Sequence, residues 1–176
     1  MPASKGLLAV GRSNLLHARA RRLTPPLELV AETDAHEGPV YVAHEHALYF
    51  TTVRREIVAI KRLDLDDGTV SVVRADAKTA NGMTLDREGR LIVCEQGTLS
   101  EPGRITRIDR RTARVETLVD SWNGLPLNSP NDVVVKSDGT IWFTDPSYGI
   151  MKPTEGHPGE LEYGDHYVFR FDPRDG

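Results

Sequence analysis

The chain has 176 residues, which is enough to bury the hydrophobic core of one ordinary domain. Its composition, 39% hydrophobic and 27% charged, is typical of a globular protein in water. The formal net charge of −4 argues against a nucleic-acid partner, because phosphate binding needs a basic surface. The single cysteine, Cys94, excludes an internal disulfide and fits a reducing compartment, so we expect a cytoplasmic protein.

Residues 1–26 are expected to form a basic and poorly ordered N-terminal extension. They contain no acidic residue, and they end in Pro25-Pro26, a pair that does not continue a helix. Their longest apolar block, Leu7–Val10, is too short for a secretory signal or a membrane span. We therefore expect no membrane partner, whereas an organellar targeting role for the basic segment stays open.

Residues 27–176 contain a segment that occurs three times, and each copy begins with an oxygen-bearing side chain. These three residues, called the openers below, are Glu37, Asn81 and Asn131, and they lie 44 and 50 residues apart (37 to 81 and 81 to 131). Each opener begins an apolar run, which a short polar turn separates from a second apolar run, at 48–51, 91–94 and 141–144. A third run follows in each copy, at 57–63, 104–109 and 167–172. Spacings of this size are typical of propeller blades.

The pattern predicts an all-β fold in which each repeat is a four-stranded antiparallel blade with its first strand nearest a central axis. Polar turns at 43–46, 86–89 and 136–139 separate the first two runs, as hairpin loops do. No segment shows sustained helical periodicity, so we expect little α-helix. The third repeat stops at Gly176, where its fourth strand should begin.

Three blades do not close a ring, because propellers commonly have four to eight blades. We therefore expect either a fragment of a longer propeller or a chain that assembles with something that completes the circle. Residues 27–30 are expected to form a short strand that would complete the final blade. The open edges of the first and third blades would favour self-association.

The openers are the first candidates for a functional site. One carboxylate, from Glu37, and two carboxamides, from Asn81 and Asn131, would converge on the axis if the blades are equivalent. Hard oxygen ligands that converge in this way suit a calcium-like cation. The alternative is that Glu37 is a solvated turn residue and that both asparagines stand where they do because Asn is common in turns.

Three further candidates, Thr52, Glu95 and Asp145, end the second strands. Glu95 and Asp145 could line the same cavity, but we favour the interpretation that they cap strand ends in solvent. Asp132 should point to the opposite face from Asn131 if its strand is regular. Cys94 lies among apolar neighbours and is expected in the core rather than as a nucleophile.

The same residues resemble the senescence marker protein, gluconolactonase and luciferin-regenerating enzyme family of six-bladed propellers. The match is to the N-terminal half of the bacterial gluconolactonase branch and covers about residues 30–176. The segments that carry it are Glu37-Gly38-Pro39-Val40, residues 81–86 with 91–95, residues 128–135 and residues 143–150.

The resemblance implies metal-dependent hydrolysis of a sugar lactone in a complete propeller, with this chain supplying half of the site. It assigns Glu37 and Asn131 as metal ligands, and Asn81 and Asn131 as residues that bind the substrate. Calcium is the expected ion, with zinc and manganese as alternatives. The family's catalytic base and its later ligands would lie beyond Gly176.

A second class of function also fits the sequence. The chain could be part of a metal-binding or interaction propeller that is not an enzyme, or an inactive fragment, because a propeller fold alone hosts many functions. Lactonase turnover, compared with metal binding alone, distinguishes these alternatives.

Overall fold

The computed structural model describes residues 27–52, 57–151 and 159–175. The predicted N-terminal extension therefore lies outside the described residues. The first sheet, blade 1, has the strand order β1-β2-β3-β4 and is antiparallel throughout. Its elements are β1 (Ala35–Val42), the 3₁₀ turn η1 (Ala43–Glu45), β2 (Ala47–Thr52), β3 (Ile60–Asp64) and β4 (Val70–Arg74).

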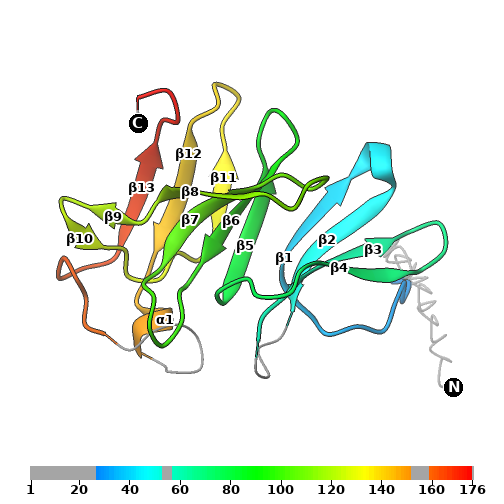
Figure 1. Ribbon diagram of the computed structural model, residues 1–176, viewed down its shortest axis with the longest axis horizontal. Helices are drawn as coiled ribbons and strands as arrows, with labels where there is room; N and C mark the ends of the chain where they lie inside the picture. The colour runs from blue at the N-terminus through cyan, green and yellow to red at the C-terminus, as the bar shows by residue number, and fades with distance from the viewer. Residues whose placement is uncertain (1–26, 53–56, 152–158, 176) are drawn as a thin grey trace, which may run out of the picture.

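Blade 2 repeats this plan, and blade 3 has three of its strands within the described residues. Blade 2 consists of β5 (Ala80–Leu85), β6 (Leu91–Glu95), β7 (Arg104–Ile108) and β8 (Val115–Val119). A short hairpin, β9 (Ser121–Trp122) and β10 (Leu125–Pro126), leads to β11 (Val133–Val135), β12 (Ile141–Asp145), the single-turn helix α1 (Tyr148–Met151) and β13 (Tyr167–Phe171). The prediction of an all-β fold with successive antiparallel blades is confirmed (Figure 1).

The blades pack face to face through two apolar cores, and β6 contributes to both. Alternate side chains of a strand point to opposite faces of its sheet. Leu91 and Val93 accordingly pack with the blade 1 residues Val40 and Tyr49, whereas Ile92 and Cys94 belong to the core shared with Val133, Ile141 and Phe143 of blade 3. A central blade needs both faces apolar, which explains why the run 91–94 does not alternate with polar residues.

Each first hairpin turns through a residue with a left-handed backbone. His46 (φ 42°), Gly89 (φ 77°) and Gly139 (φ 90°) hold this position in blades 1, 2 and 3. Glycine is the residue best suited to this conformation, and two of the three turns use it. The predicted turns at 43–46, 86–89 and 136–139 are therefore confirmed.

Two expectations from the sequence concern the strand at 27–30 and the outer face of blade 3, and they have different outcomes. The strand expected at 27–30 is wrong: the segment is extended coil, and Leu27 is 102% exposed. An isolated strand gains no ladder hydrogen bonds, and no described strand lies beside this segment. The outer face of blade 3 exposes Val134, Trp142 and Val168, and self-association through such a face remains a prediction.

Cys94 is completely buried, and burial raises the pKa of its thiol. This confirms the expectation of a core residue rather than a nucleophile, because the reactive form of cysteine is the thiolate. Within the described part of the chain, no helix is long and apolar enough to cross a membrane.

Candidate functional site

The three openers come together at the starting ends of the first strands. β1, β5 and β11 run in the same direction, with β5 in contact with both of the others (Figure 1). The backbone N–H of Gly82 donates to the carbonyl oxygen of Asn131 at 2.8 Å. The Thr51 hydroxyl donates to the carbonyl oxygens of Glu37 (3.0 Å) and Asn81 (3.4 Å). The backbones of the openers are therefore neighbours across two blade boundaries.

Glycine after the first two openers makes this approach feasible. A Cβ on Gly38 would lie 2.5 Å from the carbonyl oxygen of Asn81, and a Cβ on Gly82 would lie 2.6 Å from that of Asn131. Both distances are shorter than a carbon can approach a backbone oxygen. Gly38 follows Glu37 and Gly82 follows Asn81 because the backbone of the adjacent blade leaves no room for a side chain at either position.

The opener side chains stay accessible. Glu37 is exposed, and Asn81 and Asn131 are half-buried. Among the described residues, no group of three or more His, Cys, Asp or Glu side chains is arranged to hold a metal ion. The openers combine one carboxylate with two carboxamides.

Asn131 is held in place by the neighbouring strand β12. Its N–H donates to the carbonyl oxygen of Thr144 at 2.9 Å, and the N–H of Asp132 donates to the Thr144 hydroxyl at 3.1 Å. Asp132 itself is exposed and accepts a hydrogen bond from the N–H of Val133. Asp132 is expected on the face opposite Asn131 on the condition that both belong to a regular strand. Strand β11 begins only at Val133, so this condition is not met.

Asp145, at the end of β12, fixes the loop that leads to Asn131. It is fully buried, and its two carboxylate oxygens accept hydrogen bonds from the N–H groups of Ser129 (2.7 Å) and Asn128 (2.8 Å). The Tyr163 hydroxyl also donates to it. Burial, together with this bond to a carboxylate, raises the pKa of Tyr163. The expectation that Asp145 caps a strand in solvent is wrong.

Glu95, at the equivalent end of β6, is also fully buried rather than solvated. Its carboxylate pairs with Arg74 of blade 1, accepts from Nε of Arg104 at 2.8 Å and accepts from the Thr106 hydroxyl at 2.8 Å. A buried carboxylate is stable only with such partners. Glu95 therefore joins blade 1 to blade 2, and neither the solvent-cap nor the cavity interpretation describes it.

Thr52, the third of these strand-end candidates, is also buried. Its hydroxyl accepts from the N–H of Ala59 at 2.9 Å. Of the three strand-end residues, Asp145 therefore supports an opener, whereas Glu95 and Thr52 make structural contacts elsewhere. Sequence reasoning missed Thr51, Asn128 and Ser129 as supporting residues, because their partners lie in other blades or distant loops.

Blades that pack face to face, with their first strands side by side, define an incomplete β-propeller. The chain belongs to the SMP-30/Gluconolactonase/LRE-like family, whose model matches residues 35–175.

Individual relatives agree with this assignment. A gluconolactonase of Zymomonas mobilis is 29% identical over an alignment of 165 positions, which covers 86% of this chain and 44% of the relative. The lactonohydrolase oryL of Aspergillus oryzae is 25% identical, and the match covers 82% of this chain and 35% of that protein. The solved structure of a gluconolactonase from Xanthomonas campestris superposes with a TM-score of 0.72 at 34% identity, covering 82% of this chain and 46% of that one. The chain thus spans less than half of the length of these relatives.

Proposed function

We propose that this chain supplies half of a metal-dependent lactonase site built on a β-propeller. In this proposal Glu37 and Asn131 bind a divalent cation, and Asn81 and Asn131 bind a sugar lactone. The observation that carries the proposal is the contact between the openers: Gly82 donates to Asn131, and Gly38 packs on Asn81. Glu37 and Asn131 are 94 residues apart in the sequence, and these contacts bring them to the same end of the first strands.

The donor set suits a hard cation, and calcium is the ion we expect, with zinc and manganese as alternatives. Calcium takes six to eight oxygen ligands, and one carboxylate with two carboxamides supplies only part of that number. Water and residues beyond Gly176 would supply the rest. A bound cation would polarise the lactone carbonyl and stabilise the negative charge that develops on its oxygen.

The openers themselves would orient the substrate. A carboxamide both donates and accepts hydrogen bonds, so Asn81 and Asn131 can each hold a sugar hydroxyl while their backbones are fixed by the adjacent blade. Glu37 would act as a metal ligand. The proton acceptor for the attacking water would be a carboxylate of the later blades, since the buried carboxylates Glu95 and Asp145 are already bound by structural partners.

The family and the named relatives support hydrolysis of a lactone as the reaction class. The activity stays a proposal for this chain because the match spans 44% of the Zymomonas relative. A propeller that binds the cation without turnover is the second candidate, and the same assay separates the two.

The test is hydrolysis of glucono-1,5-lactone by the chain joined to the remaining part of the Zymomonas relative. We expect turnover that calcium or another divalent cation stimulates and that Glu37→Gln lowers by about a hundredfold or more, as loss of a metal ligand would. Glu32→Gln is the matched control, because Glu32 is also exposed but lies outside the openers. Full activity in a folded Glu37→Gln protein would contradict the proposal, and cation binding without turnover would favour the second candidate.

A further inference from the structure

The opposite ends of the blades, upper in Figure 1, carry equivalent hairpin turns with an acidic residue in each. Glu45, Glu88 and Asp138 each precede the left-handed residue of their turn. Two boundaries between blades can therefore be compared position by position. A cavity lies at each boundary, about 340 Å³ between blades 1 and 2 and about 470 Å³ between blades 2 and 3, and the two differ in how the charges around them are paired.

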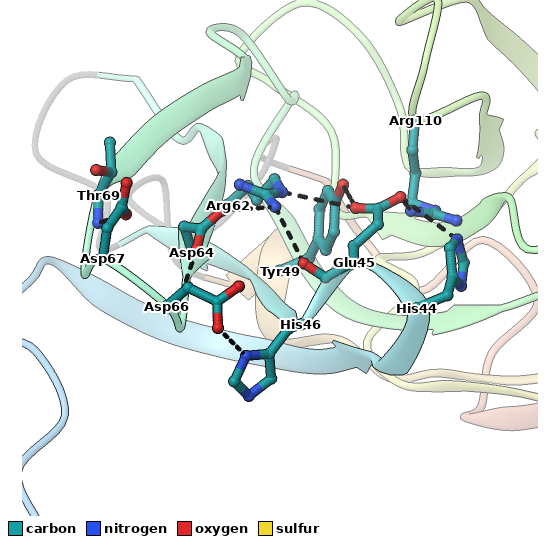
Figure 2. A network of polar contacts seen from close by, with 10 residues as sticks. All are labelled: His44, Glu45, His46, Tyr49, Arg62, Asp64, Asp66, Asp67, Thr69 and Arg110. Atoms are coloured by element: carbon teal, nitrogen blue, oxygen red, sulfur yellow. Dashed lines mark hydrogen bonds and ion pairs between the residues drawn. The ribbon is translucent and has the colours of Figure 1, made fainter.

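At the boundary of blades 1 and 2, Arg110 connects the two blades. It follows β7 of blade 2, pairs with Glu45 of blade 1 and donates through Nε to the carbonyl oxygen of Gly89 at 2.6 Å. Its guanidinium lies 5.5 Å from the ring centre of Tyr49, whose hydroxyl donates to Glu45 at 2.6 Å. Figure 2 shows Arg110 and Tyr49 converging on Glu45. The Arg110 side chain is only 6% exposed, and its charge is paired with that of Glu45.

At the boundary of blades 2 and 3, the residue equivalent to Arg110 is Pro173. Ile108 ends β7 and is followed by Asp109-Arg110, and Phe171 ends β13 and is followed by Asp172-Pro173. Proline has neither charge nor a donor, so it cannot reach Glu88 as Arg110 reaches Glu45. Glu88 pairs instead with Arg90 of its own hairpin, at 2.5 Å.

A cavity of about 470 Å³ occupies this boundary. Its apolar wall consists of Ile92, Val135 and Ile141, and its remaining lining is mostly charged: Asp86, Arg87, Glu88, Arg90, Arg107, Asp138 and Arg174. A volume of this size accommodates a small organic molecule.

Most of the charged side chains that line the cavity are paired with other residues, including Arg107 with Glu116 and Arg174 with Asp172. The carboxylates of the cavity are already neutralised within their own turns: Arg90 binds both Asp86 and Glu88, and Lys136 binds Asp138. Arg87, in contrast, has no carboxylate partner among the described residues. Its Cδ lies 3.8 Å from the position of a Cβ on Gly139, so the side chain crosses from blade 2 to blade 3.

We propose that the cavity between blades 2 and 3 is a binding site for a small oxyanion, either a phosphate or a carboxylate. The planar guanidinium of Arg87 provides paired donors that match either group, whereas Arg107 and Arg174 in the walls are already paired with Glu116 and Asp172. Val135, which is half-buried, would contact an apolar part of the ligand. The site lies at the end of the blades opposite the openers, so it is separate from the proposed lactone site.

The proposal is tested by titrating the 176-residue chain with inorganic phosphate at constant ionic strength, with backbone amides observed by NMR. We expect saturable shifts at Arg87 and Gly139 with a dissociation constant below about 10 mM, and unchanged amides at Gly38 and Gly82. Arg87→Gln should weaken binding by about tenfold or more. Arg111→Gln is the matched control, because Arg111 is also exposed but lies outside this cavity, and it should leave binding unchanged.

A parallel titration with acetate separates the two ligand chemistries. Tighter binding of phosphate assigns a phosphate ligand, and tighter binding of acetate assigns a carboxylate. Shifts that do not saturate with either anion, or shifts that Arg87→Gln leaves unchanged while the protein stays folded, would overturn the proposal.

Discussion

Gly82→Ala is expected to lower the free energy of unfolding by about 3 kcal/mol, as overpacking and loss of a backbone hydrogen bond together would. The new Cβ would lie 2.6 Å from the carbonyl oxygen of Asn131 and 2.8 Å from Cα of Asp132. Both atoms belong to the backbone, so no rotation of a side chain relieves the collision. The first strands of blades 2 and 3 must separate, which breaks the 2.8 Å bond from Gly82 to Asn131.

Urea unfolding of the purified variant measures this loss. Gly124→Ala is the comparison variant. No atom lies within 4 Å of the Cβ position at Gly124, so the alanine variant is destabilised only by the left-handed backbone of that residue (φ 79°). If Gly82→Ala costs no more than Gly124→Ala, the close approach of Gly82 to Asn131 is not a feature of the folded protein.

Glu95→Gln is expected to destabilise the fold by about 3 kcal/mol or more, the usual result of removing one member of a buried ion pair. The amide keeps the shape of the side chain but leaves Arg74 and Arg104 without their shared carboxylate. Arg74 comes from blade 1 and Arg104 from blade 2, so the contact between the two blades should weaken first.

Glu116→Gln provides a control of the same chemistry at the surface. Glu116 pairs with Arg107 at 2.7 Å, but its side chain is 50% exposed, and exposed pairs contribute about 1 kcal/mol or less. Thermal and urea unfolding of both variants should show a clear difference. Equal losses would mean that Glu95 is solvated in the folded chain, as its sequence position alone suggests.

The repeat pattern predicts the blades well because it depends on local rules. The alternation of apolar runs with turns at 43–46, 86–89 and 136–139 specifies hairpins, and the 44- and 50-residue spacings place the openers at equivalent points. Equivalent points of adjacent blades must lie side by side. The convergence of the opener backbones therefore follows from the repeat spacing alone.

The environment of the strand ends could not be predicted in the same way. Glu95 is buried because Arg74 and Arg104 reach it, and Asp145 is buried because Asn128, Ser129 and Tyr163 supply donors. Arg104 stands opposite Glu95 in the pairing of β6 with β7, but Arg74 lies on an edge strand of another blade and the donors to Asp145 lie in loops, so periodicity does not predict those pairings. The exposure of 27–30 likewise depends on a neighbouring strand that the segment cannot provide.

The most direct test of the opener site is manganese-induced broadening of amide signals in the 19.5 kDa chain. A bound paramagnetic ion broadens nearby resonances even when binding is weak, which is expected for a site with so few protein ligands. We predict that the amides of Gly38, Gly82 and Asn131 broaden first, that excess calcium reverses the effect, and that Glu37→Gln abolishes it. Broadening confined to the acidic turn at 64–67, or unchanged by Glu37→Gln, would contradict the claim that the openers bind a cation.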